Sequence, residues 1–210
     1  KIPRTEYGAT ENWPLIEAVT GLKVNYSSDL LEKLNAGKAF MDAWDYGLVW
    51  NVLVHYQYLQ GRVTNMGHAE FDADGLDLDQ NVTCPFNSPE EVLAYDPWEE
   101  AGLYEKNALK DQFEGVYNFF CGHNPNALNM SGIYITLFSG MIAVFGWEML
   151  LVAGGQDRKG FGKVVHRYEK WIKQFFEAFA ESNIPIMMVH DDITWTSGPV
   201  FHPEFYREFI

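Results

Sequence analysis

The chain has 210 residues, of which 47% are hydrophobic and 16% are aromatic, so it can bury a sizeable core and its composition excludes a disordered chain. Its 15 Lys and Arg residues against 29 Asp and Glu residues give a formal net charge of −14. Because a phosphate backbone or an anionic membrane surface binds clustered positive charge, this balance excludes general nucleic-acid binding and membrane adhesion.

The cysteine content and the apolar segments favour a soluble cytoplasmic protein. Cys84 and Cys121 are too few for the disulfide framework of a small secreted domain, which indicates a reducing compartment. The first residues lack the apolar segment of a signal peptide. The longest apolar stretch, 140–153, is interrupted by Glu148 and is too short to span a bilayer.

The order of apolar runs, capping residues and turn residues predicts strands that alternate with helices. In chain order we expect a strand over 2–7, helices over 13–19 and 30–41, a strand over 47–54, a long loop over 58–87, helical segments over 89–120 with breaks near Pro97 and Gly102, a strand over 132–137, helices over 139–152 and 158–179, a strand over 184–189, and a last helix over 204–210.

Two of these elements have especially clear patterns. Residues 47–54 are a near-continuous apolar run, which is typical of a strand buried on both faces of a parallel sheet. The segment after Asp157 repeats large apolar residues at positions i, i+3, i+4 and i+7, as one buried face of a helix does. That stripe consists of Phe161, Val164, Val165, Tyr168, Trp171, Ile172, Phe175 and Phe179.

Strands separated by helices pair in parallel through right-handed crossovers. The four expected strands are too few for an eight-stranded barrel, which typically takes about 250 residues. The last helix also reaches 209–210 without a capping signal. The sequence therefore predicts an α/β fold in which residues 1–210 form a single partial (β/α)8 barrel domain, with about four strands and their helices, truncated on its C-terminal side.

In parallel α/β folds the ligand site lies at the carboxyl ends of the strands, which selects segments 4–7, 55–70, 138–139 and 190–198. The last segment is the most informative, because it begins with His-Asp-Asp directly after an apolar strand. An imidazole beside carboxylates can serve as an acid/base pair, a substrate clamp or a set of metal ligands. The alternative is structural, with one Asp capping a turn and the His bonded to a buried carbonyl group.

The other candidate residues point to no metal ligand within this chain. His68, in the sequence Met-Gly-His-Ala-Glu, either faces a substrate or lies on the surface of the long loop. The acidic run 72–79 has its glycine at the wrong position for a calcium loop and lacks the closing glutamate. Cys84 and Cys121 have no His or Cys neighbours at zinc spacing.

The segment 190–210, which reads HDDITWTSGPVFHPEFYREFI, resembles the uroporphyrinogen decarboxylase superfamily. Members carry an Asp-rich strand end, a Gly-Pro turn and a helix of the form P-E-x-Y-R-E-F. The shorter motifs PRTEY at 3–7, MGHA at 66–69 and GWE at 146–148 resemble its branch of cobalamin-dependent methyltransferases, which includes O-demethylases of methoxylated aromatics. The resemblance covers essentially the whole chain and implies a (β/α)8 barrel of which roughly the last third is absent.

The resemblance implies one of two enzyme activities. The decarboxylases hold their substrate carboxylates with an Arg-rich loop after the first strand, where this chain has Arg4 and the acidic Glu6. A polycarboxylate porphyrinogen is also a poor match for a net charge of −14. We therefore expect methyl transfer from a small donor, such as a methoxylated aromatic compound, to a corrinoid (cobalamin) on a partner protein. The alternatives are uroporphyrinogen decarboxylation and a non-catalytic half-barrel binding module.

The methyl-transfer hypothesis assigns roles to particular residues. The expected catalytic residues, which would orient the donor and stabilise charge on the leaving oxygen, are Asp191, Asp192, His190 and Glu6. The expected substrate contacts are Arg4, Tyr7, Trp50, His68, Trp195 and Ser197. Related enzymes carry zinc ligands on later strands, so zinc would be bound by ligands outside this chain. A half-barrel exposes strand edges, so pairing into a homo-oligomer is also expected.

Overall fold

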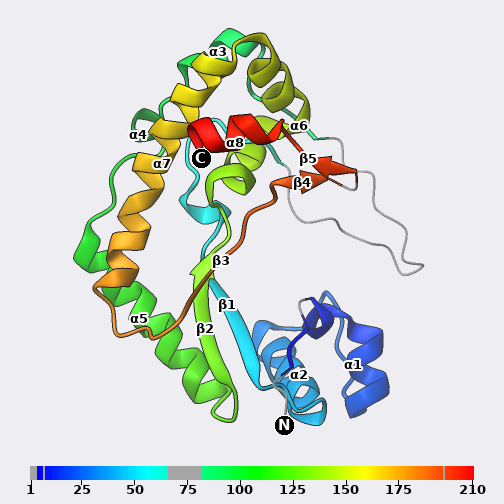
Figure 1. The fold of residues 1–210 in the computed structure, drawn as a ribbon. Coiled ribbons are helices and arrows are strands. Elements are labelled where there is room, and N and C mark those ends of the chain that lie inside the picture. The colour runs from blue at the N-terminus through cyan, green and yellow to red at the C-terminus, as the bar shows by residue number, and fades with distance from the viewer. Residues whose placement is uncertain (1–3, 7, 66–81, 196) are drawn as a thin grey trace.

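The computed structural model describes residues 4–6, 8–65, 82–195 and 197–210, with the backbone alone for Trp195. Helices predominate over strands in these residues (Figure 1). The elements in chain order are η1 (Ala9–Glu11), α1 (Trp13–Thr20), α2 (Leu30–Ala43), β1 (Leu48–Val54), η2 (Tyr56–Tyr58), α3 (Pro89–Ala94), α4 (Pro97–Glu100), α5 (Lys106–His123), β2 (Leu128–Ile133), α6 (Leu137–Gln156), α7 (Arg158–Ala180), β3 (Met187–Val189), β4 (Thr194–Trp195), β5 (Gly198–Pro199) and α8 (Pro203–Phe209).

Strands β1, β2 and β3 form a parallel sheet in that order, whereas β4 and β5 form a separate antiparallel hairpin. Helices α3 to α5 connect β1 to β2, and helices α6 and α7 connect β2 to β3. Helix α5 packs against β1 and β2, and α7 packs against α5 on the same side of the sheet (Figure 1). The carboxyl ends of the three parallel strands therefore lie together at one edge of the sheet.

The predicted (β/α)8 barrel is wrong as a description of this structure, in its partial form as well. The described residues form a mixed fold of eight α-helices with a small parallel sheet of three strands, not four barrel strands. The strand predicted over 132–137 ends at Ile133, because Thr136 is already the cap residue of helix α6. The strand predicted over 184–189 is reduced to β3, three residues that follow Pro185, which has no N–H to donate.

The first predicted strand, 2–7, is also wrong for its described residues 4–6, which have no strand structure. The carbonyl group of Arg4 accepts a hydrogen bond from the N–H of Gly47 at 3.0 Å, just before β1 begins. A single backbone contact of this kind holds the segment near the sheet without adding a strand to it.

Most helix boundaries follow the predicted caps and breaks. Helix α1 ends at Gly21, whose φ of 75° lies in the left-handed region that glycine adopts at little cost. The Asp29 side chain caps α2 by accepting the N–H of Glu32 at 2.8 Å. The breaks expected near Pro97 and Gly102 separate α3, α4 and α5. The helical predictions rest on local chemistry and are largely confirmed.

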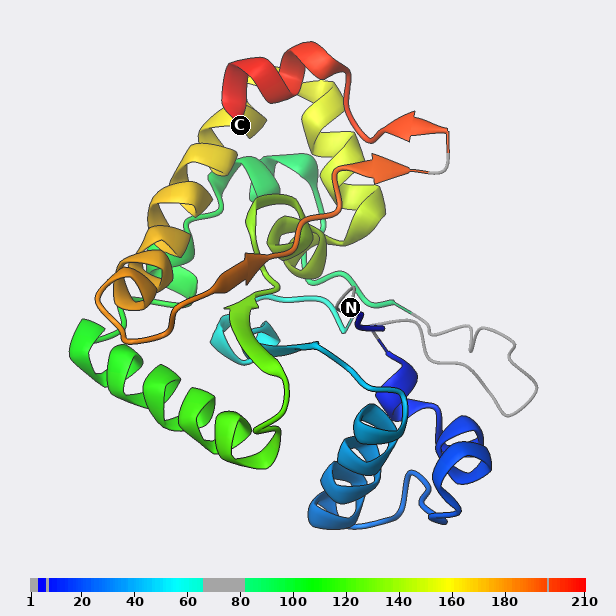
Figure 2. The ribbon, with the colours of Figure 1, turned by 60° about the horizontal axis from the view of Figure 1, so that its bottom comes forward.

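The apolar residues form two cores. The smaller core lies between α1, α2 and the segment that follows α2. It consists of Ile16, Ala36, Phe40 and Tyr46. These two helices lie beside the start of β1 and apart from α5 and α7 (Figure 2). The main core lies between α6, α7 and the helices around them, and it includes all eight residues of the stripe predicted for α7.

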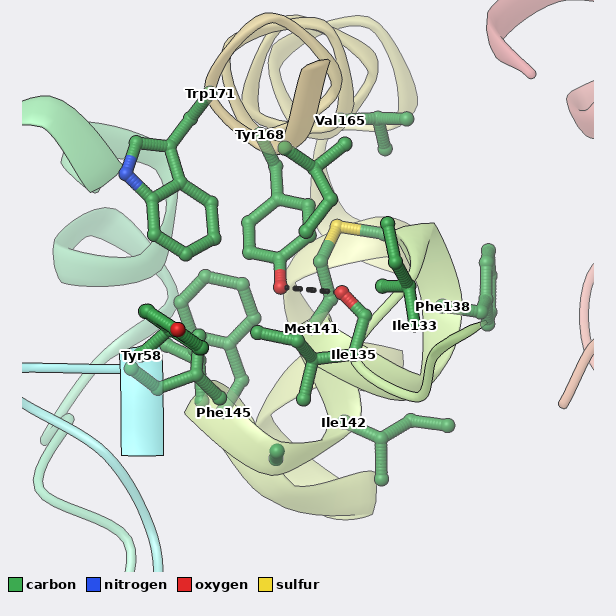
Figure 3. Close-up of a cluster of buried hydrophobic side chains, with 14 of the residues drawn as sticks. Tyr58, Ile133, Ile135, Phe138, Met141, Ile142, Phe145, Val165, Tyr168 and Trp171 are labelled. Atoms are coloured by element: carbon green, nitrogen blue, oxygen red, sulfur yellow. Dashed lines mark hydrogen bonds between the residues drawn. The ribbon is translucent and has the colours of Figure 1, made fainter. Parts of the chain in front are cut away.

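Tyr168 links the main core to the turn that follows β2. Its hydroxyl group donates a hydrogen bond to the carbonyl oxygen of Ile135 at 2.9 Å (Figure 3). Complete burial raises the pKa of Tyr168 well above its ordinary value, so the phenol stays neutral and remains a donor. A Cβ atom at Gly140 would collide with this hydroxyl group, so only glycine at that position leaves room for the bond.

Helix α6 is longer than the predicted 139–152 and is kinked. Gly146 has φ 70° and ψ 166°, a left-handed backbone that interrupts the helix and favours glycine. The helix has 20 residues and a mean hydropathy of 1.7, so its length and composition alone would allow it to span a membrane. Since 67% of its most apolar stretch of 18 residues is buried inside the protein, α6 packs as a core helix does.

We expect Tyr168→Phe to lower the free energy of unfolding by about 1–3 kcal/mol, because the buried Ile135 carbonyl group loses its donor. Urea denaturation measures this difference. Tyr26→Phe is the matched control: Tyr26 is 76% exposed, so we expect a change within about 0.5 kcal/mol. Equal effects of the two substitutions would contradict the role given to the buried hydrogen bond.

Candidate functional site

The candidate site is formed by the segments that follow the three parallel strands. The N–H of Tyr134 donates to the carbonyl group of Val54 at 2.8 Å, and the N–H of His190 donates to that of Ile133 at 3.1 Å. These bonds hold the chain segments side by side one residue beyond the ends of the strands. Side chains that follow different strands are thus brought to the same edge.

The segment after β3 is bound to the first turn of α6. The hydroxyl group of Thr136 donates to the carbonyl oxygen of His190, and the N–H of Asp192 donates to Ser139 Oγ at 3.0 Å. Asp191 Oδ1 accepts the backbone N–H groups of Phe138 at 2.9 Å and of Ser139 at 2.8 Å. Thr136 makes no side-chain cap of its own, so Asp191 supplies the N-terminal cap of α6 from another part of the chain.

Asp191 is a half-buried carboxyl group with a structural role. Burial raises its pKa above the ordinary value of 3.8, while the N–H groups of Ser139 and Phe138 act in the opposite direction. Its oxygens are occupied by backbone donors rather than open to a ligand. The geometry agrees with the structural alternative for this residue, in which an Asp caps a turn, and a direct catalytic role for Asp191 stays a prediction.

His190 and Asp192 form the more accessible part of the site. His190 Nε2 lies 3.6 Å from Asp192 Oδ1, and the two side chains are 28% and 58% exposed. On the other side of the ring, His190 Nδ1 lies 3.4 Å from Ser139 Oγ. The imidazole is therefore held between a buried hydroxyl group and a carboxylate that faces solvent.

An aromatic stack surrounds the imidazole. The Tyr134 and His190 rings are nearly parallel, with centroids 4.2 Å apart and planes inclined by 6°. The centroid of the Trp50 ring lies 6.2 Å from that of the His190 ring and 6.4 Å from that of the Tyr134 ring. The Trp50 plane is inclined by 28° to the His190 plane and by 30° to the Tyr134 plane. His55, at the end of β1, lies 4.9 Å from Tyr134. Trp50, a predicted substrate contact, is thus brought together with His190.

Ser139, His190 and Asp192 lie in the order of a serine nucleophile, its base and the orienting acid, but the surroundings do not suit nucleophilic catalysis. Ser139 is 5% exposed, and its oxygen already accepts the N–H of Asp192. The N–H groups at the start of α6, which could stabilise an oxyanion, are bonded to Asp191. The arrangement is better suited to orienting an imidazole for proton transfer.

Two other predicted site residues lie elsewhere. Arg4 and Glu6 are exposed, and their carbonyl groups contact Gly47 at 3.0 Å and the Tyr46 hydroxyl group at 3.5 Å. These contacts place them at the amino end of β1, opposite the edge that carries His190. The prediction grouped them with His190 because it assumed a first strand over residues 2–7, which the described residues 4–6 do not form.

The remaining predicted contacts are only partly described. Tyr7 and His68 lie outside the described residues, and the backbone of Trp195 pairs with Gly198 in the hairpin. Ser197 is exposed and lines a cavity of about 310 Å³ between α6 and the hairpin. The other residues lining that cavity are Trp147, Leu151, Pro199 and Val200.

Neither Tyr134 nor Thr136 was among the predicted site residues. Both fall within the strand predicted over 132–137, in which they would have been ordinary sheet residues. The available signal was Thr136 itself, since Thr before a long apolar segment is typical of a helix N-cap. A helix start at 137 would have placed Tyr134 and Thr136 in the turn at the carboxyl edge.

The described residues offer no ready metal site. Within the parts of the chain that the structure describes, no group of three or more His, Cys, Asp and Glu side chains is placed to hold a metal ion. Cys84 is exposed and Cys121 is half-buried, and both are free thiols.

We expect Asp191→Ala to lower the free energy of unfolding by about 1–3 kcal/mol, because it leaves the N–H groups of Phe138 and Ser139 without their acceptor. Asp192→Ala removes an exposed carboxylate from the adjacent position, so we expect a change within about 0.5 kcal/mol. Thermal and urea unfolding of the two variants measure the contrast. A more stable Asp191→Ala protein would disprove the capping role.

The stability contributed by Asp191 should also depend on pH. Because its pKa is raised from 3.8, the folded chain binds this proton more tightly than the unfolded chain does. Stability contributed by the protonated group is therefore lost as pH rises from about that value through the raised pKa. Relative to Asp191→Asn, which has no proton to lose there, the wild-type chain should lose stability over this window. Urea titrations at stepped pH test this, and a wild-type advantage that grows with pH would contradict it.

Comparison of the chain with protein-family models, with curated proteins and with solved structures gives no match. The resemblance to the uroporphyrinogen decarboxylase superfamily therefore rests on the sequence motifs quoted above. A functional assignment has to be argued from those motifs and from the geometry of the site.

Proposed function

We propose that the chain is a methyltransferase that binds a small methoxylated aromatic donor at the carboxyl edge of its sheet and passes the methyl group to a corrinoid on a partner protein. The observation that carries the proposal is the stack of Trp50, Tyr134 and His190 beside the carboxylate of Asp192. This combination offers flat apolar surface together with a group that can transfer a proton.

The stack supports an aromatic donor of modest size. Aromatic rings pack favourably against one another in offset or edge-on arrangements, so a donor ring would extend the stack at the half-buried Trp50. Tyr134, which is 7% exposed, supports the stack from inside. The charged side chains placed at this edge include the carboxylates of Asp191 and Asp192, which repel a polycarboxylate substrate. A neutral methoxylated ring therefore suits the site better than a porphyrinogen does.

The chemistry requires a proton or a hydrogen bond at the leaving oxygen. The bond between the methyl carbon and the donor oxygen breaks, its electron pair stays on the oxygen, and the methyl carbon bonds to the acceptor. A reduced corrinoid, when bound, supplies the electron pair for that new bond. His190 in its protonated form gives the Nε2 proton to the oxygen as negative charge develops there, and Asp192, 3.6 Å from Nε2, orients the ring.

The exposure of the site supports an acceptor that another protein delivers. Asp192 is 58% exposed and His190 is 28% exposed, so the proton donor faces the outside of the described structure rather than a closed cavity. The described residues provide no ligand set for zinc, and zinc held by ligands outside this chain stays a prediction. The described chain contributes donor binding and proton transfer.

The proposal is tested by incubating the purified chain with 2-methoxyphenol and free cob(I)alamin as the acceptor probe. We expect catechol by mass spectrometry and methylcobalamin by absorbance. His190→Ala should lower the rate about 10²–10⁴-fold, the usual contribution of a general acid. His202→Ala is the matched control, because the His202 side chain is 73% exposed and lies at the start of α8. An unchanged rate in His190→Ala, or no transfer from any of a series of methoxylated rings, would refute the proposal.

A further inference from the structure

We propose that the amino edge of the sheet carries a second binding site, which takes a small primary alkylammonium compound. The site is a cavity of about 260 Å³ between the end of α2, the end of α5 and the starts of β1 and β2. Its polar wall includes Asp42, Asp45, Asn124 and Asn126, and its apolar wall includes Met41 and Val49. It lies at the edge of the sheet opposite His190 and is independent of the proposed methyltransferase function.

The topology of the sheet brings two helix ends to this cavity. Helix α2 leads into β1 and helix α5 leads into β2, and the two strands are parallel neighbours whose first residues, Leu48 and Leu128, are paired. Both helices end where these strands begin (Figure 1). Because Asp42 belongs to the last turn of α2 and Asn124 is the cap residue of α5, the C-termini of both helices border the same cavity.

The described charges around the cavity favour a cation. The C-terminus of a helix carries roughly half a negative charge, because its last carbonyl groups have no partner within the helix. Asp42 and Asp45 add two carboxylates at the end of α2. Lys38 returns one positive charge to this end by pairing with Asp42 at 2.5 Å. A positively charged ligand would therefore be attracted to the cavity, and an anion would be repelled.

The side-chain amide of Asn124 is buried without a hydrogen-bond partner among the described residues. Asn124 is 6% exposed. Its backbone N–H donates to the carbonyl group of Phe120 at 2.8 Å, and its carbonyl group accepts the N–H of Ala127 at 3.3 Å and the side-chain amide of Asn129 at 3.1 Å. The backbone of Asn124 is thus satisfied, and its side-chain amide is the group left to meet a ligand. Since buried polar groups are almost always hydrogen-bonded, this amide indicates a polar ligand in the cavity.

The composition of the wall favours an organic cation over a metal ion. A calcium ion typically takes about six to eight oxygen ligands, whereas an ammonium group has three protons to donate and needs only three acceptors. Oxygens of Asp42, Asp45 and Asn124 supply acceptors of this kind. Met41 and Val49 offer apolar surface that an alkyl chain would bury and a metal ion would not use. The volume of about 260 Å³ likewise suits a short alkyl chain better than a single ion.

The test is a titration of the ¹⁵N-labelled chain with butylammonium chloride, followed through the side-chain amide signals of Asn124 in ¹H–¹⁵N spectra. Through-bond correlation to the backbone of Asn124 assigns these signals without any variant. We expect a saturable shift of the signals with butylammonium and none with butanol, which has the same chain without the charge. No saturable shift with butylammonium, or an equal response to butanol, overturns the proposed site.

Two substitutions distinguish a ligand contact from a structural role. Asn124→Ala removes an amide that bonds no described residue, so we expect an unchanged urea midpoint and about tenfold weaker binding of butylammonium. Asp45→Asn removes one charge and should weaken binding similarly, and Asn tolerates the φ of 57° at this position. Binding by the variants is followed through the backbone N–H signal of Val49. Unchanged affinity in both folded variants overturns the site.

Asp111→Asn is the matched control for the net charge of −14. Asp111 is exposed on α5, about 20 Å from Asn124 along the helix, so its loss should leave binding unchanged. Weakening equal to that in Asp45→Asn would show attraction by the whole chain and overturn the site. Calcium chloride is titrated in parallel, and a larger saturable shift of Asn124 with calcium than with butylammonium would overturn the assignment of the ligand.

Discussion

The interaction on which the candidate site depends is the cap that Asp191 places on helix α6. The first turn of α6 exposes backbone N–H groups that Thr136 does not satisfy, and the carboxylate that satisfies them comes from the far end of the α6–α7 crossover. The same contact fixes the path of the chain after β3, so His190 and Asp192 are placed by a bond that neither of them makes. Burial of the carboxylate opposes this gain, which links the geometry of the site to a desolvation cost.

The main core supports the Asp191 cap through Tyr168. The Tyr168 hydroxyl group bonds the carbonyl group of Ile135, the residue just before the cap position of α6, and Gly140 leaves room for that ring one turn later. Helix α7 therefore fixes the position of the turn that follows β2. Because Tyr134 lies in that turn, α7 also fixes how the Tyr134 ring packs against His190. The aromatic stack at the carboxyl edge of the sheet is thus positioned by Tyr168 in the core.

Features that depend on residues close together in the sequence, such as helix breaks and a buried helix face, were predicted well. The breaks near Pro97 and Gly102 and the α7 stripe each depend on residues close together in the sequence, and the structure agrees with them. The sequence predicted poorly what depends on distant partners, since strand length is set by the neighbouring strand and an apolar run does not reveal where pairing stops. Of the candidate site, Trp50, His190 and Asp192 lie together as expected, whereas Glu6 was misplaced by the assumption that residues 2–7 form a strand. The use of Asp191 as a remote cap has no signature in the spacing of residues.

The remote cap also bears on the order in which the molecule assembles. Asp191 and Phe138 are 53 positions apart, so their contact closes only after the intervening crossover has folded back and β3 has paired with β2. Until then the first turn of α6 lacks its acceptor and His190 lacks its place beside Tyr134. Competence to bind a ligand should thus arise as one of the last events of folding, and a chain stalled before that event would hold most of its helices and none of its site.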